Sequence, residues 1–212
     1  MAQDWWRRLP AEERREYQRS ERISRVELQP DATFAKLVGA IERSLAADDP
    51  VETERASQAL VNLVARGLGI PTADISVQGQ RPPDGDGELH GIYRPAEGPE
   101  RDRISVWMRT AKRMDVVATR TFLRTLLHEV GHHIDMRLLD LPNSYHSKGF
   151  YQRESSLFRV ITRGTALEPG SGRRRSAEPP PPAPAEPKTD VQLGLRLLRA
   201  AVDDIAARKD KP

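Results

Sequence analysis

The sequence predicts an α+β protein in which a small antiparallel or mixed sheet packs on one long helix. Two observations predict this class. Apolar residues recur every three or four positions in several segments, as they do in amphipathic helices. In three short segments near the middle of the chain they alternate with polar residues, as they do in strands. A chain of 212 residues is long enough for one domain with extensions.

The predicted helices lie on both sides of the predicted strands. Helices are expected at 32–47, 52–66, 115–139 and 148–162, and strands at 74–78, 88–93 and 103–108. Asp31 is expected to cap the first helix, and Gly67 to end the second.

The domain is flanked by segments of different composition. Residues 1–29 are predicted to form a charged N-terminal helix or arm that docks by its aromatic end. Residues 30–165 form the predicted domain, residues 166–189 a proline-rich disordered linker, and residues 190–212 a C-terminal amphipathic helix. Either terminal helix is a candidate binding site for a partner protein.

The composition excludes several kinds of protein. The chain has no cysteine, so disulfides, thiolate ligands and a cysteine nucleophile are all excluded. No apolar run reaches the roughly 20 residues that a membrane-spanning helix needs, and the first residues show no signal for secretion, so we expect a cytoplasmic protein. The net charge of +3 is too small to indicate nucleic-acid binding.

The segment His128-Glu129-Val130-Gly131-His132 falls in the longest predicted helix. Residues four apart lie on one helix face, about 40° from each other, so both imidazoles can bind one Zn²⁺ at about 2.0–2.1 Å. Glu129 lies about 100° around the helix from His128, where it can act as general base without binding the metal. Asp135 lies on the face of His128 and can accept the free N–H of a ligating ring.

A third ligand is needed, because catalytic Zn²⁺ usually has three protein ligands and one open position. His146 follows a predicted loop and opens a helix. Glu154 falls within the apolar stripe of that helix, where a carboxylate needs a cation, a metal or a strong donor. The residues by themselves leave both candidates open. His133 and His90 are expected to be ordinary polar residues.

Two segments resemble known metallopeptidases. Leu126–His133 resembles the active-site helix of zincins, and His146-Ser147-x-x-Phe150 resembles the third-ligand segment of the SprT-like and YgjP-like minimal zincins. The resemblance implies a small α+β domain with a three-histidine site and a neighbouring strand that holds a peptide substrate, a part that 103–108 could play. Glu154 is instead similar to the third ligand of gluzincins. We favour His146 and keep Glu154 as the alternative.

The predicted function is that of a zinc-dependent metallopeptidase, which hydrolyses a peptide or protein substrate with a zinc-activated water and Glu129 as general base. The alternative is a regulatory or binding protein of the same fold, in which the metal is structural or acts as a sensor. SprT-like proteins carry a cysteine zinc ribbon that this chain lacks, which argues against a role in DNA repair.

Overall fold

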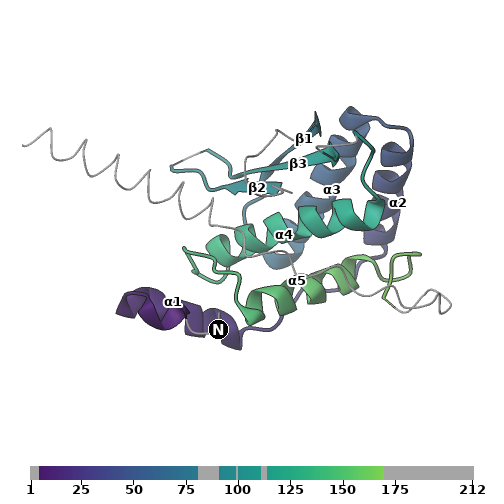
Figure 1. The fold of residues 1–212 in the computed structure, drawn as a ribbon. Helices are drawn as coiled ribbons and strands as arrows, with labels where there is room; N and C mark the ends of the chain where they lie inside the picture. The colour runs from purple at the N-terminus through teal and green to yellow at the C-terminus, as the bar shows by residue number, and fades with distance from the viewer. Residues whose placement is uncertain (1–4, 81–90, 99, 111–113, 170–212) are drawn as a thin grey trace, which may run out of the picture. The chain divides into compact units, whose positions relative to one another are not determined.

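The computed structural model describes residues 5–80, 91–98, 100–110 and 114–169 (Figure 1). Most of the predicted linker, the predicted helix at 190–212, and His90 lie outside these residues. The described residues form an α+β domain, as the sequence predicts. Its helices are η1 (Trp5–Arg8), α1 (Ala11–Arg22), α2 (Ala32–Ala46), α3 (Pro50–Leu68), α4 (Thr119–Arg137) and α5 (Lys148–Ile161), and its strands are β1 (Asp74–Gln80), β2 (Gly91–Arg94) and β3 (Arg103–Arg109).

The three strands form a mixed sheet in the order β1-β3-β2. β1 is parallel to β3, and β2 is antiparallel to it. Because β3 has a strand on each side, it has no free edge for a peptide, and the prediction that 103–108 holds the substrate is wrong. Among the described residues, β2 is an edge strand, with no strand on its outer side.

Helix α4 lies beside β2 and β3 and is buried along most of its length (Figure 1). It continues without a break through Gly131, where a Cβ would lie 3.1 Å from the Phe150 ring of α5. The helix begins later than the sequence predicts, because Val116 pairs with Arg109 in an isolated β-bridge. This start leaves the histidine motif in the buried second half of the helix.

Helices α2 and α3 pack together beside the sheet and α4. Asp31 caps α2 as predicted, by accepting a hydrogen bond from the backbone N–H of Thr33. The prediction that Gly67 ends α3 is wrong: Gly69 ends it, in the left-handed conformation at φ 68° that favours glycine. Gly67 serves packing, because a Cβ there would lie 2.7 Å from a methyl carbon of Leu28.

Helix α1 packs against α5. The aromatic residues of the N-terminal segment dock, although they come from two elements: Trp6 of η1 stacks on Tyr17 of α1 with 5.4 Å between ring centroids, and Tyr17 lies edge-on to Tyr145 at 5.9 Å. Tyr145 belongs to the loop between α4 and α5, so the N-terminal segment contacts the same loop that carries His146.

Candidate metal centre

Three histidines converge at one point between α4 and the loop that follows it. His128 and His132 leave the same face of α4, with ring centroids 5.0 Å apart. The Nε2 atom of His146 lies 3.0 Å from Nε2 of His128 and 3.1 Å from Nε2 of His132. One nitrogen from each ring thus lies within 4.8 Å of the other two. The structure brings together His128, His132 and His146, the three histidines favoured from the sequence.

Glu154 lies behind His128 instead of beside the other ring nitrogens. Its Oε2 atom is 3.2 Å from Nδ1 of His128, and Arg124 donates to its Oε1 at 3.2 Å. A carboxylate accepts hydrogen bonds, so Nδ1 of His128 carries a proton, and in the neutral ring Nε2 presents a lone pair. Glu154 therefore fixes the tautomer of His128, and Arg124 supplies the cation that its burial requires.

Ser144 fixes the tautomer of His132 in the same way. Its Oγ atom donates to Oδ2 of Asp135 at 3.0 Å and lies 2.7 Å from Nδ1 of His132. A hydroxyl has one proton, and here Asp135 accepts it, so Ser144 accepts the proton of Nδ1. Nε2 of His132 is left with a lone pair that points at the other two rings.

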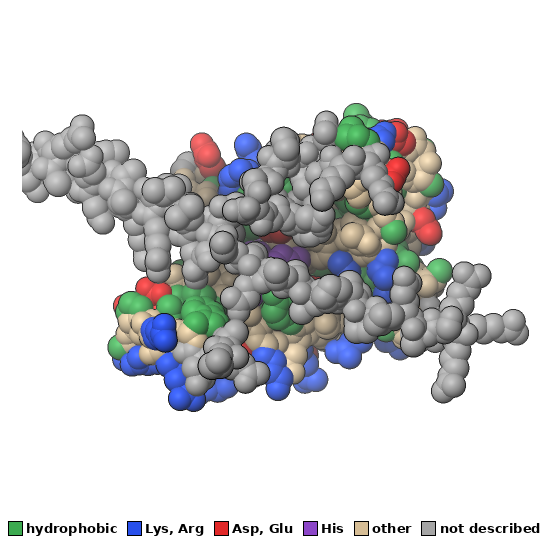
Figure 2. Space-filling view, in the orientation of Figure 1, with side chains coloured by type: hydrophobic (Ala, Val, Ile, Leu, Met, Phe, Trp, Pro, Cys, Tyr) green, Lys and Arg blue, Asp and Glu red, His purple; other side chains and the backbone are tan. Residues whose placement is uncertain are grey.

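This arrangement suits a metal ion. Nε2 of His146 lies 3.0–3.1 Å from Nε2 of the other two rings, close to the spacing of nitrogen ligands around one ion. Nitrogen ligands of a tetrahedral Zn²⁺ are about 3.3 Å apart, given bonds of about 2.0–2.1 Å. Three nitrogen ligands leave one position open, and the His128 side chain is 27% exposed, so the cluster reaches the surface. Figure 2 shows histidine surface on the face seen in Figure 1.

Two of the three rings, those of His132 and His146, are held in the neutral form that can bind a metal near neutral pH. Burial lowers the pKa of His132 well below its usual value, and burial together with the charge of His128 lowers the pKa of His146 to about 3. Burial also acts to lower the pKa of His128, but the hydrogen bond to Glu154 and the nearby carboxylate charges outweigh it and raise that pKa. Neutral imidazole is the form that binds metal.

Glu129 lies on the sheet side of α4, against β2. A Cβ on Gly91 would lie 2.6 Å from Oε1 of Glu129, so the strand approaches the carboxylate as closely as only glycine permits. Tyr93 donates its backbone N–H to the same carboxylate. Burial raises the pKa of Glu129 to about 7. A carboxylate with such a pKa can take up and release a proton near neutral pH.

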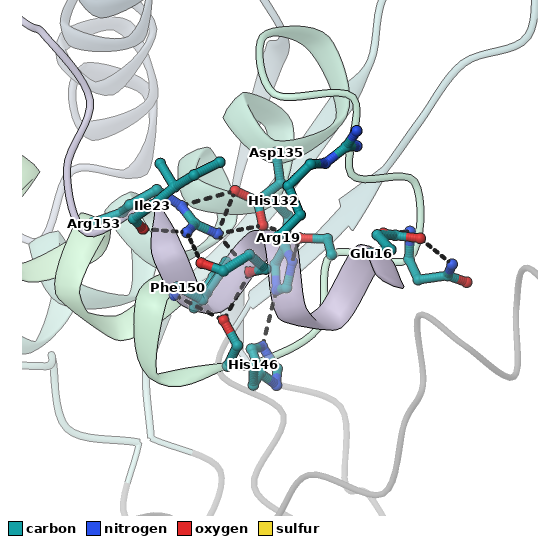
Figure 3. Close-up of polar contacts among 12 residues, drawn as sticks. Glu16, Arg19, Ile23, His132, Asp135, His146, Phe150 and Arg153 are labelled. Carbon is teal, nitrogen blue, oxygen red and sulfur yellow. Dashed lines mark hydrogen bonds and ion pairs between the residues drawn. The ribbon is translucent and has the colours of Figure 1, made fainter. Parts of the chain in front are cut away.

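The sequence predicts that Asp135 accepts an N–H directly from a ligating ring, but in the structure it reaches the ring only through Ser144. It contacts no ring of the cluster directly, because the Ser144 hydroxyl lies between it and His132 (Figure 3). Its other partner is Arg153, which donates to both carboxylate oxygens at 2.8–3.1 Å. Burial raises the pKa of Asp135 to about 6, although Arg153 and Ser144 act in the opposite direction.

Sequence reasoning missed Ser144, Arg153 and the β2 residues around Glu129. Arg153 left a signal, because it falls in the buried stripe of α5 and a buried guanidinium needs an acceptor. Ser144 left none: its place depends on a loop in which it adopts a φ of 39°. His133 is an ordinary buried polar residue, as expected, with oxygen partners at 2.8 Å on both ring nitrogens.

Comparisons of the chain with models of known protein families, with curated proteins and with solved structures find no match. The geometry of the histidine cluster therefore carries the functional argument. In the part of the chain that the structure describes, no helix combines the length and the apolar character that crossing a membrane requires.

Proposed function

We propose that this protein is a zinc-dependent metallopeptidase of the zincin type, with His128, His132 and His146 as the metal ligands. One observation carries the proposal: a nitrogen from each of three histidine rings lies within 4.8 Å of the other two, and the buried carboxylate of Glu129 interacts electrostatically with His128. The two outer acceptors, Glu154 and Ser144, hold the tautomers that make this convergence possible.

The metal would supply Lewis acidity, which polarises a carbonyl group and lowers the pKa of water. The protein supplies the proton transfer. Glu129, with a pKa raised to about 7, accepts a proton from the attacking water at its carboxylate and passes it to the leaving amine. Its contact with the Tyr93 N–H and its fit against Gly91 hold the carboxylate in place during both transfers.

The neighbouring edge strand favours an extended peptide as the substrate. The outer side of β2 has no strand partner among the described residues, and β2 contacts Glu129 through Gly91 and Tyr93. Backbone groups of an extended peptide can pair with such an edge and gain affinity without a particular side-chain sequence. A peptide paired there would run past the general base. We therefore propose that β2, and not residues 103–108 of β3, binds the substrate.

The proposal is tested with Glu129→Gln beside the wild type. The substitution removes the base but no ligand, so the protein should retain about one Zn²⁺ per chain while the rate of peptide cleavage falls about 10²–10⁴-fold. Metal content is measured by mass spectrometry, and cleavage with a mixture of peptides from a digested cell extract. Glu42→Gln, the same change at an exposed position of α2, is the control.

Two results would contradict the proposal. A wild-type protein that binds no Zn²⁺ would remove the metal centre. A Glu129→Gln protein that cleaves as fast as the wild type would remove the assigned base, and the regulatory alternative would take the place of the peptidase.

The third ligand is tested by comparing His146→Ala with Glu154→Ala. Loss of a ligand should weaken Zn²⁺ binding by far more than the roughly 10–100-fold typical of residues behind the ligands. His146→Ala should show the larger loss and Glu154→Ala the smaller, measured by competition with a chromophoric chelator. The reverse order would assign the ligand position to Glu154.

A further inference from the structure

Helix α1 holds the loop that carries His146, although α1 lies outside the metal centre. Glu16 accepts hydrogen bonds from the backbone N–H of Asn143 at 2.7 Å and from its side-chain amide at 2.5 Å. Glu13 accepts one from the Tyr145 hydroxyl at 2.5 Å. Two carboxylates of one helix thus hold the stretch of loop that leads to His146.

The same helix holds the residues that follow His146. Glu21 accepts a hydrogen bond from the backbone N–H of Lys148 at 2.5 Å. The hydroxyl oxygens of Ser20 and Ser147 lie 2.7 Å apart and share a hydrogen bond that is buried. Because Ser147 also caps α5, α1 contacts the loop on both sides of the third ligand.

Arg153 joins the end of α1 to the interior. Its guanidinium donates to the backbone carbonyls of Ser20 at 2.9 Å and Ile23 at 2.6 Å, while its other nitrogens bind Asp135. Carbonyls at a helix C-terminus lack partners within the helix and attract cations. Arg153 is 4% exposed, so release of α1 would leave part of a buried cation without acceptors.

Hydrogen bonds connect the ion pair of Arg153 and Asp135 to the histidine cluster, whose members His132 and His146 are labelled in Figure 3. Asp135 accepts the proton of Ser144, and Ser144 accepts the Nδ1 proton of His132. Gly149 permits the contact between the helices, because a Cβ there would lie 1.9 Å from the carbonyl oxygen of Ser20. Gly149 and Arg153 of α5 and Ser20 of α1 therefore all favour the packing of these two helices.

We propose that Glu13, Glu16 and Ser20 are positioning residues of the metal centre, and that docking of α1 and binding of the metal stabilise each other. The inference rests on the proposed metal site but not on the reaction. An ion that requires His146 and the Ser144-bound tautomer of His132 in place favours the docked helix. By linkage, docking of the helix raises metal affinity by the same factor, and any event that releases α1 lowers it.

The wild-type full chain provides the first test. Backbone amide hydrogen exchange is measured with Zn²⁺ and with a chelator. Zn²⁺ should slow exchange in residues 11–22 about tenfold, within the usual range of coupling between two sites. Exchange in the first two turns of α3 should not change, because that segment contacts neither the loop nor α1. Mg²⁺, which prefers oxygen ligands, should have no effect on α1.

The second test changes the helix. The double substitution Glu13→Gln/Glu16→Gln should weaken Zn²⁺ binding about 10–100-fold, as changes behind the ligands do. The visible absorption of bound Co²⁺ should change as well, because a loosened His146 alters the geometry of the ion. Glu12→Gln, which makes the same change on the exposed face of α1, should leave both unchanged.

The outcomes separate this inference from the proposed function. Absence of Zn²⁺ binding in the wild type would overturn the metal centre and the coupling with it. Tight Zn²⁺ binding, with unchanged exchange in α1 and unchanged affinity in the double variant, would overturn the coupling and leave the metal centre in place. If the double variant does not fold, the wild-type exchange measurement decides.

Discussion

Two neighbouring histidines of α4 have opposite surroundings. Both ring nitrogens of His133 lie 2.8 Å from oxygen acceptors, on Asp102 and on the Pro71 carbonyl. His132 has one oxygen partner, Ser144, and its Nε2 meets another ring nitrogen, that of His146. Both rings are buried, so burial does not distinguish a candidate ligand from a structural histidine. The two histidines are distinguished by the hydrogen-bonding partners of their ring nitrogens.

The cluster around His133 is complete without a ligand. Asp102 accepts hydrogen bonds from the Tyr93 hydroxyl at 2.6 Å, the Ala96 N–H at 2.9 Å and Nε of Arg137 at 2.8 Å, besides its contact with His133. Burial acts to raise the pKa of Asp102, but these hydrogen bonds hold it well below its usual value. A buried cluster whose polar atoms all meet oxygen partners or donors stabilises the fold, whereas ring nitrogens that meet one another form a group that could hold a cation.

The largest effect is expected when the two histidines are replaced one at a time by alanine. His132→Ala should weaken Zn²⁺ binding by more than about 10³-fold, equivalent to about 4 kcal/mol. His133→Ala should lower the free energy of unfolding but change Zn²⁺ affinity little. Chelator competition and chemical denaturation of both variants measure the two effects. Equal losses of zinc would show that the two environments do not differ in function.

A smaller effect is expected from Asp102→Ala. Removing one partner of a buried ionic network typically costs about 3–5 kcal/mol of stability. We expect the lower end, because the Arg137 side chain is 34% exposed and can turn to water. Urea denaturation measures the change. A variant that keeps its stability but loses Zn²⁺ would mean that the Asp102 cluster belongs to the metal centre.

The smallest effect concerns pH in the metal-free protein. The pKa of His146 is lowered to about 3 by burial and by the charge of His128, so the unfolded chain takes up this proton first, below about pH 6.5. The contribution of the neutral ring to stability is therefore present above that pH and is lost as the pH falls towards 3.

Wild type and His146→Gln are compared without metal between about pH 7 and pH 5. Relative to the variant, the wild type should lose up to about 1 kcal/mol per pH unit in free energy of unfolding. An identical pH response of the two proteins would mean that the folded ring of His146 takes up a proton as readily as the unfolded one.

Much of the fold could be predicted because its signals are local. The helix periods placed α2, α4 and α5 to within a few residues, and the Asp31 cap was recognised from its position. The errors have physical causes of longer range. Gly67 makes room for Leu28, which is far away in sequence, and α4 starts late because Val116 pairs with β3.

The pairing of His128 with His132 and the offset of Glu129 could be predicted without the structure, since helix geometry places residues four apart on one face whatever surrounds them. The tertiary structure was needed to see that His146 lies beside the other two ring nitrogens while Glu154 lies behind His128, and to find the contacts of Ser144, Arg153 and α1. The contacts that α1 makes with the loop and with Arg153 join residues more than 120 positions apart in the chain. A local sequence pattern cannot predict contacts between residues so far apart in the chain. These contacts depend on how the loop between α4 and α5 folds back against the N-terminal helix.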